Sequence, residues 1–132
     1  MTERPLRATV HQKAALFGPG RDVLLLRDPD DGWEFPGGRL GVGERPLDGL
    51  RREVREETGL AVEVDRPVHT AAWRSSGTNR FVVVYRCTTD GARVELSEEH
   101  VEHRWATPAE ASAVLSERLA TGLEYALDGG ES

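Results

Sequence analysis

Three glutamates within five positions are the residues whose type and spacing best suit chemistry in this sequence. Glu53, Glu56 and Glu57 lie in the segment REVREETG, and Glu44 lies just upstream. Successive residues of a helix turn by about 100°, so a helix would place the three carboxylates on one face. Like charges at this spacing repel each other. Clustered oxygen ligands suit hard divalent cations, so the cluster predicts a site for Mg²⁺ or Mn²⁺.

A solvated, salt-bridged helix face is the alternative interpretation, because Arg51, Arg52 and Arg55 are interleaved with the glutamates. The surrounding glycines bear on the choice. Gly37 and Gly38 precede the helix and give its entry unusual backbone freedom. Inside the helix, Gly49 costs about 1 kcal/mol relative to alanine. Either it leaves space beside the carboxylates for a bulky group or it is merely tolerated, and both explanations stay open.

The element that must carry the cluster is a helix from Pro46 to Thr58. Proline is favoured in the first turn of a helix, and Gly59 suits its C-terminal cap. A separate apolar stripe is expected to pack on a sheet. Its members are Leu47, Leu50, Val54 and Thr58. The glutamates border this stripe, so they should lie at the edge of a cleft.

The rest of the chain interleaves strands and helices. Strands are predicted at 6–17, 23–26, 60–64, 68–74, 80–88 and 101–105, with a short extended piece at 33–35. The run at 23–26 is apolar throughout, as in a strand buried on both faces. A closing helix should start after the N-cap Thr107 and reach about Leu119, and the tail from Tyr125 should fray. These elements predict an α/β fold with a mixed sheet covered by helices.

Length and charge limit the class of protein. The 132 residues predict a single domain over 1–132, and 38% of them are apolar, as in a globular protein. A net charge of −6 argues against a nucleic-acid or anionic-membrane binder. A polyanionic substrate would therefore need a cation to approach the acidic site.

Cysteine content and hydropathy bear on the compartment. Cys87 is the only cysteine, so an intrachain disulfide is not possible, and its place in FVVVYRC predicts a buried small hydrophobe. The N-terminus lacks the apolar segment of a signal peptide, and apolar runs stay well short of a membrane span. The expected location is the cytoplasm.

The segment 38–60 resembles the signature of the Nudix hydrolases position for position. That signature is Gly, five residues, Glu, seven residues, Arg-Glu, an aliphatic residue, any residue, Glu-Glu, any residue, Gly and an aliphatic residue. It is filled here by Gly38, Glu44, Arg52, Glu53, Val54, Glu56, Glu57, Gly59 and Leu60. The flanking WEFPGG, EHVEHRW and TPAEA segments also resemble family features, so the likeness reaches most of the chain.

The resemblance implies a Nudix fold, an α/β/α sandwich around a mixed sheet. It also implies hydrolysis of a nucleoside diphosphate linked to another group, by attack of water on phosphorus. By position, Glu53, Glu56 and Glu57 would be metal ligands together with the Gly37 carbonyl. Glu53 would also be the candidate base. Arg52 would orient the carboxylates, Glu44 would brace the loop, and Gly38 and Gly59 would shape its two ends.

Family members often add a glutamate from a later loop. The candidates are Glu98, Glu99 and Glu102, and the spacing to Trp105 favours Glu99. The alternative for each of the three is that it is an ordinary acidic residue on the surface.

Substrate contacts are less clearly marked. Arg27 resembles family residues that meet substrate phosphate, although an ion pair with Asp28 or Asp30 is the alternative, and Glu34 could face the pocket. Trp33, Trp73 and Trp105 could stack a nucleobase or belong to the core, whereas Phe81 and Tyr85 are predicted as core.

The leading hypothesis is a Mg²⁺-dependent hydrolase, with Mn²⁺ as a possible substitute. The expected substrates are nucleoside triphosphates (including oxidised ones), ADP-ribose, nucleotide sugars or dinucleoside polyphosphates. One alternative is a nucleotide-sensing module without turnover, and another is hydrolysis at RNA 5′ ends. The related isoprenyl diphosphate isomerases need a loop cysteine, which the mid-strand Cys87 does not supply. The expected partner is a small nucleotide substrate, and neither a membrane nor a nucleic acid is expected to bind. The protein is expected to be a monomer or a homodimer.

Overall fold

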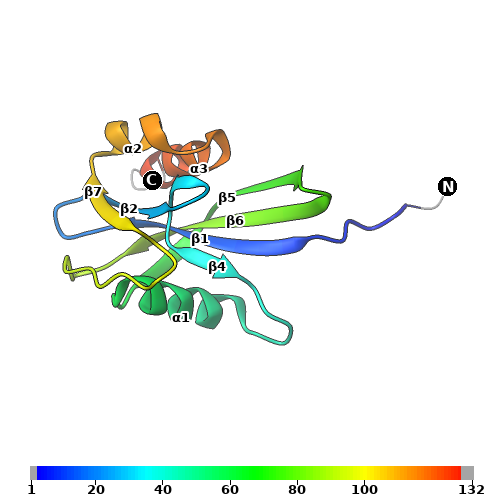
Figure 1. Cartoon of the computed structure of the whole chain (residues 1–132), viewed down its shortest axis with the longest axis horizontal. Coiled ribbons are helices and arrows are strands. Elements are labelled where there is room, and N and C mark those ends of the chain that lie inside the picture. Colours follow the sequence, from blue (N-terminus) through cyan, green and yellow to red (C-terminus); the bar gives the residue numbers. More distant parts are fainter. Residues whose placement is uncertain (1–2, 129–132) are drawn as a thin grey trace.

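A mixed sheet of seven strands organises residues 3–128, the part of the chain that the computed structural model describes (Figure 1). Its centre is β1 (Thr9–Phe17), which pairs in parallel with β6 (Thr78–Thr88) along its whole length. β5 (Glu63–Ser75) pairs antiparallel with β6. β2 (Val23–Asp28) meets β1 only at its start and then pairs with two later strands. Parallel and antiparallel pairs therefore coexist, as predicted.

The remaining strands are short and bring the signature into the sheet. β3 (Gly32–Glu34) and β7 (Glu102–Ala106) both pair antiparallel with β2. β4 (Gly37–Arg39) pairs with β1 through His11, Gln12 and Lys13. β4 was not predicted, because its three residues were interpreted as part of a flexible loop.

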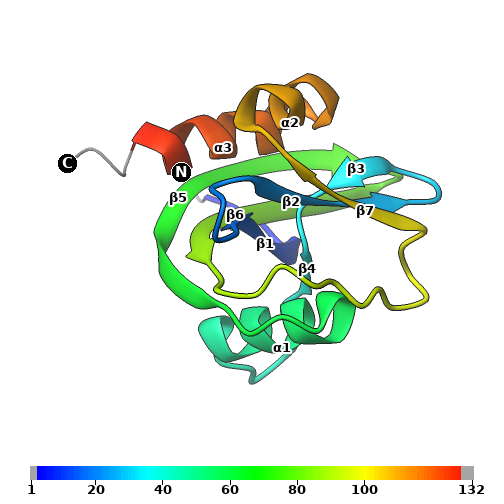
Figure 2. The same cartoon turned by 90° about the vertical axis from the view of Figure 1, so that its left-hand side faces the viewer.

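Helices cover both faces of the sheet (Figure 2). α1 (Pro46–Thr58) packs on one face, and α2 (Pro108–Val114) and α3 (Glu117–Asp128) pack on the other. Alternate strand residues point to opposite faces. Leu24 and Leu26 therefore join the α1 side while Val23 and Leu25 join the opposite core, and all four are fully buried. The predicted α/β sandwich, including the strand buried on both faces, is confirmed.

The ends of α1 agree with the prediction. Gly59 adopts a left-handed φ of 76°, and its N–H donates to the Arg55 carbonyl at 2.8 Å. The predicted apolar stripe is wrong at one position, because Leu47 in the first turn is 40% exposed. The buried face includes Thr58 as predicted and also Glu57, whose carboxylate accepts a backbone hydrogen bond described below.

Most predicted boundaries differ from the structure by one or two residues, and a few differ by more. The first strand begins at Thr9 rather than residue 6. The two strands expected at 60–64 and 68–74 form the single strand β5, in which Pro67 borders a register shift; a bulge tolerates the missing N–H of proline. The closing helix breaks at Leu115, which is extended with ψ of 155°. α3 then continues to Asp128, so the frayed end expected from Tyr125 is helical as far as that residue, and the rest lies outside the described residues.

A long segment, residues 89–101, returns from β6 to β7 past the end of α1. Backbone hydrogen bonds fix its course. Glu95 N–H donates to the Thr58 carbonyl at 2.8 Å, and Ser97 N–H donates to the Glu57 carbonyl at 3.3 Å. These bonds bring the residues before β7 to the buried side of the glutamate cluster. Within residues 3–128, none of the helices is long and apolar enough to cross a membrane.

Candidate active site

The three glutamates of α1 share one region but differ in exposure. The Glu57 side chain is 6% exposed, that of Glu53 22%, and that of Glu56 58%. The cluster therefore runs from the helix–sheet junction out to solvent. This gradient agrees with the predicted position at the edge of the buried stripe.

Glu57 is held at the innermost end of the cluster. Its Oε1 accepts a hydrogen bond from the Gly37 N–H at 2.8 Å. Burial raises the pKa of the Glu57 carboxyl to about 7, although the Gly37 N–H and the charge of Lys13 act in the opposite direction. A buried carboxylate with so little compensation favours binding of a cation.

Glu53 lies directly against the backbone of Gly38. A Cβ at Gly38 would come within 2.6 Å of the Glu53 carboxylate, so glycine is needed there for close approach. Burial raises the pKa of Glu53, and the charges of Glu56 and Glu99 add to that rise, whereas Arg52 lowers it. A raised carboxyl pKa suits a general base that works near neutral pH.

Arg52 joins the carboxylates to the preceding loop. Its Nη2 donates to Glu53 Oε1 at 3.1 Å, and its Nη1 donates to both Glu56 oxygens at 3.1 Å. Nε and Nη2 also donate to Glu44 Oε2, at 3.1 and 2.8 Å. These bonds raise the pKa of Arg52 above its usual range, Glu44 and Glu56 contributing most. The salt-bridged interpretation of this face is therefore correct for Arg52, while Arg51 lies beside Asp48 at 3.8 Å.

Glu44 explains the glycine inside α1. A Cβ at Gly49 would lie 2.7 Å from the Glu44 carboxylate, so the missing side chain makes room for Glu44. Glu44 also accepts the Gly41 N–H at 3.1 Å. The Gly41 hydrogen bond, followed by Arg52, lowers the pKa of Glu44. Of the two explanations left open for Gly49, the structure supports the first, with a residue of the chain itself as the bulky group.

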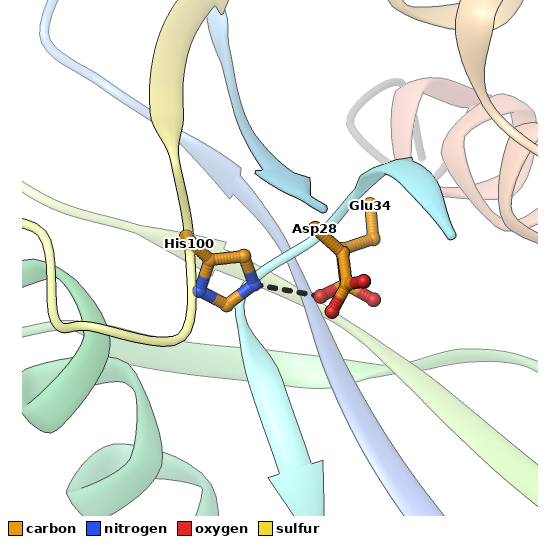
Figure 3. Close-up of side chains that lie close together, drawn as sticks. All are labelled: Asp28, Glu34 and His100. Atoms are coloured by element: carbon orange, nitrogen blue, oxygen red, sulfur yellow. Dashed lines mark hydrogen bonds and ion pairs between the residues drawn. The ribbon is translucent and has the colours of Figure 1, made fainter. Parts of the chain in front are cut away.

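His100 is a site residue that the sequence reasoning missed. Its side chain is 2% exposed, and its Nε2 lies 2.7 Å from Glu34 Oε2 (Figure 3). Its Nδ1 lies 4.0 Å from Glu57 Oε2. No histidine was among the predicted site residues, although the position directly after Glu99 was an available signal.

The three glutamates considered as an additional ligand from the later loop have different surroundings in the structure. Glu99 contributes an oxygen that lies within 4.8 Å of ligand atoms of Glu57 and His100. Glu102 instead accepts a hydrogen bond from Arg27 at 2.9 Å, across the pair β2 and β7. Glu98 is exposed. Geometry therefore brings Glu99 to the cluster and assigns Glu102 to an ion pair.

The predicted substrate contacts have identifiable partners. Arg27 forms an ion pair, but with Glu102 and not with Asp28 or Asp30, so the partners named for the alternative role were wrong. Asp28 accepts the N–H groups of Asp30 and Asp31, and these bonds help lower its pKa against the opposing effect of burial. Its carboxylate lies beside Glu34 and His100 (Figure 3). Glu34 is also 3.3 Å from Lys13, so it faces this cluster.

The tryptophans have core or surface packing roles. Trp33 and Trp73 pack against the core under α2 and α3, and the Arg118 guanidinium lies 3.8 Å above the Trp73 ring. Trp105 packs on the α1 side, and its indole N–H donates to the Ala92 carbonyl at 3.0 Å.

The other residues predicted to lie in the core differ in how deeply they are buried. Tyr85 is buried as predicted, whereas Phe81 is only half-buried. Cys87 is fully buried, and burial raises its pKa to about 12, as fits an unreactive thiol.

Helices cover both faces of a mixed sheet, and a glycine-rich loop leads into the glutamate-bearing helix, as the family resemblance implies. Comparison with known proteins agrees. The NUDIX domain family model matches residues 9–127. A MutT-like protein of Streptomyces ambofaciens is 37% identical over 129 residues, which span 97% of this chain and 82% of the relative. The chain belongs to the NUDIX domain family.

Two further proteins resemble this chain, one in its fold and one over part of its sequence. The crystal structure of a MutT protein from Methanosarcina mazei Go1 superposes with a TM-score of 0.83 over 100% of both chains at 23% identity, which establishes the fold. An RNA pyrophosphohydrolase of Xanthomonas oryzae is 52% identical over 57 residues, but these span 36% of this chain and 28% of that protein. Hydrolases of the NUDIX family act on pyrophosphate bonds and generally use divalent metal ions.

Proposed function

We propose that this protein hydrolyses the pyrophosphate linkage of a small nucleoside diphosphate derivative with the help of Mg²⁺, for which Mn²⁺ can substitute. The observation that carries the proposal is the row of glutamates on α1, whose innermost carboxyl, Glu57, is buried and has an oxygen within 4.8 Å of one of Glu99. The substrate class comprises nucleoside triphosphates (including oxidised ones), ADP-ribose, nucleotide sugars and dinucleoside polyphosphates.

The residues present fit a divalent ion. Glu53, Glu56 and Glu57 would bind it, with the Gly37 carbonyl and Glu99 as further oxygen ligands. The fit rests on charge as well as position, because burial opposes ionisation of Glu57 and a cation would reverse that penalty. A bound divalent ion would neutralise charge on the phosphate oxygens and on the leaving group.

Side chains of the protein itself would accept the proton of the attacking water and orient the carboxylates. Glu53 would accept the proton of the water that attacks phosphorus, and its raised pKa makes it a more effective base. Arg52 holds Glu53 and Glu56 with donors from one planar guanidinium. Glu44 fixes that guanidinium to the loop before α1.

Arg27 is the residue that would meet a substrate phosphate. Arg27 is half exposed, and an exposed ion pair such as that with Glu102 contributes little stability, so a substrate phosphate can replace the carboxylate. Glu34 instead engages His100 and Lys13, which favours a role in shaping the site over direct contact with substrate.

A small nucleotide is favoured over an RNA end. The net charge of −6 opposes the counterion-driven binding that long nucleic acids use. The RNA pyrophosphohydrolase likeness spans only 36% of the chain, whereas the MutT-like relative matches 97%. A binding module without turnover is disfavoured because every specified glutamate of the signature is retained.

The test is a panel of the four substrate types and a triphosphorylated RNA, each with Mg²⁺, scored by released phosphate and pyrophosphate. We expect Glu53→Gln to lower turnover on the active substrate by about 10²–10⁴-fold with the fold intact. Glu98→Gln, on an exposed glutamate of the later loop, is the matched control and should keep full activity. Full Mg²⁺-dependent activity in Glu53→Gln would refute the assigned base, and a folded protein inactive on the whole panel would refute the proposed reaction.

A further inference from the structure

His100 carries a buried ring nitrogen that the proposed chemistry does not use. Within the described residues, Nδ1 has no hydrogen-bond partner, although the side chain is only 2% exposed. A buried polar atom without a partner costs free energy, so its presence calls for an explanation, and a bound ion is one that the neighbouring carboxylates support. The question is which group would face this nitrogen.

The other ring nitrogen defines the tautomer. Nε2 lies 2.7 Å from Glu34 Oε2, and an ionised carboxylate can only accept a hydrogen bond. Nε2 therefore carries the hydrogen, and in the neutral ring Nδ1 presents a lone pair. Glu34 is itself fixed by Lys13, whose Nζ lies 3.3 Å from its other oxygen. Figure 3 shows Glu34 on β3 and His100 on the segment before β7, with the ring edge directed at the carboxylate.

The lone pair of Nδ1 faces carboxylates. Glu57 Oε2 lies 4.0 Å away, and ligand atoms of Glu57, Glu99 and His100 all lie within 4.8 Å of one another. Two ligands on one ion stand at most about 4.2 Å apart, because each lies about 2.1 Å from the metal. Three ligands on one ion stand closer still, at about 3.0–3.6 Å, so movements of about 1 to 2 Å, mainly of the exposed Glu99, would bring all three onto one ion.

We infer that His100 Nδ1 is a metal ligand, which with Glu57 and Glu99 forms a mixed nitrogen and oxygen site for a divalent transition metal. The inference rests on the metal binding in the proposed function and extends it to a ligand outside the signature. Metal-binding histidines usually donate their second ring N–H to a carboxylate, and Glu34 occupies that position.

A nitrogen ligand changes which ion the site prefers. Carboxylates alone suit Mg²⁺, whereas imidazole favours transition metals. Mn²⁺ should therefore bind at this position in preference to Mg²⁺, and His100 should account for the difference.

The experiment compares wild-type protein with His100→Gln and His103→Gln. Glutamine at 100 can still donate a hydrogen bond toward Glu34 from the position of Nε2 but lacks the Nδ1 ligand. His103 is exposed on β7 and serves as the matched control. Mn²⁺ and Mg²⁺ dissociation constants are measured by calorimetry, and electron spin-echo modulation of bound Mn²⁺ detects a directly coordinated nitrogen.

We expect nitrogen modulation in wild type and in His103→Gln, with a changed frequency when histidine is labelled with ¹⁵N, and its loss in His100→Gln. The Mn²⁺ dissociation constant should rise at least about tenfold in His100→Gln, while that for Mg²⁺ changes by less than about threefold. The labelled wild-type spectrum decides the matter even if His100→Gln does not fold.

Two results would overturn the inference. Mn²⁺ bound to wild type without nitrogen modulation would leave the proposed function intact and make His100 a purely structural link between Glu34 and the later loop. Failure of wild type to bind Mn²⁺ at all would remove the inference together with the metal site on which it rests.

Discussion

The Glu57 carboxylate accepts a hydrogen bond from the Gly37 N–H at 2.8 Å, and this bond joins the last turn of α1 to β4. The bond connects the start of the loop that precedes α1 with the end of α1, and the glutamate cluster lies between these two points. Because Glu57 is also buried, the stability of the apoprotein should depend on the protonation of this one carboxyl.

The first prediction is a stability that falls with pH through Glu57. The folded-state pKa is raised from 4.5 to about 7, so the folded protein holds a proton that the unfolded chain releases. The free energy of unfolding should therefore decrease by up to about 3 kcal/mol as the pH rises from about 4.5 to 7. Urea unfolding in EDTA should show this slope in wild type and in Glu56→Gln, and Glu57→Gln should largely remove it. An identical slope in Glu57→Gln would contradict the assignment.

Gly37 should tolerate no side chain. A Cβ there would lie 2.0 Å from the Gln12 backbone carbonyl oxygen, at a φ of 152°, and backbone cannot move aside as a flexible side chain can. Gly37→Ala should lower the free energy of unfolding by about 2–4 kcal/mol. Gly20→Ala meets open space and is the control, measured in the same urea titrations. Equal stability of the two variants would show that β4 can shift.

Gly49 and Glu44 should be energetically coupled. Alanine at a helix interior is worth about 1 kcal/mol over glycine. At position 49 a steric clash offsets that gain, because the added Cβ would lie 2.7 Å from the Glu44 carboxylate. Gly49→Ala should therefore stabilise the Glu44→Ala background more than it stabilises wild type. A double-mutant cycle in urea measures the difference, and a coupling of zero would mean that the two groups do not compete for space.

Arg52 should act through the geometry of its donors. Lysine retains the charge but cannot donate simultaneously to Glu44, Glu53 and Glu56. Arg52→Lys should lower kcat by about 10- to 100-fold with little change in Tm, because misplaced carboxylates impair catalysis more than folding. Arg51→Lys, next along α1 and paired only with Asp48, should behave as wild type. A kcat in Arg52→Lys equal to that of wild type would exclude an orienting role.

Some of this architecture is visible in the sequence because it is encoded locally. The apolar spacing, Pro46 and Gly59 define α1 without reference to the rest of the chain. β2 is recognisable as an apolar run between turns. The helix break at Leu115 contains neither glycine nor proline, the residues that usually indicate a break in the sequence. For this reason α2 and α3 were predicted as one helix.

Other features depend on distant parts of the chain. β4 is a strand only because β1 supplies its hydrogen bonds, and Gly-Gly-Arg carries no side-chain pattern of its own. His100 is identified by its neighbours, and Glu34 lies 66 residues earlier. The roles of the signature residues stay predictions that come from the family resemblance, while the contacts among them come from the structure.

The parallel pairing of β1 with β6 has a consequence for how the protein is made. During synthesis, 38–60 emerges well before 78–88, so the residues of the glutamate-bearing helix are made before the central strand has its partner. Pairings that close such long stretches of chain form slowly, and a nascent chain that ends before residue 78 cannot complete the sheet on which α1 rests. Assembly of the carboxylates is thus a late event in folding, and a short peptide cut from this segment should not reproduce the cation binding of the whole protein.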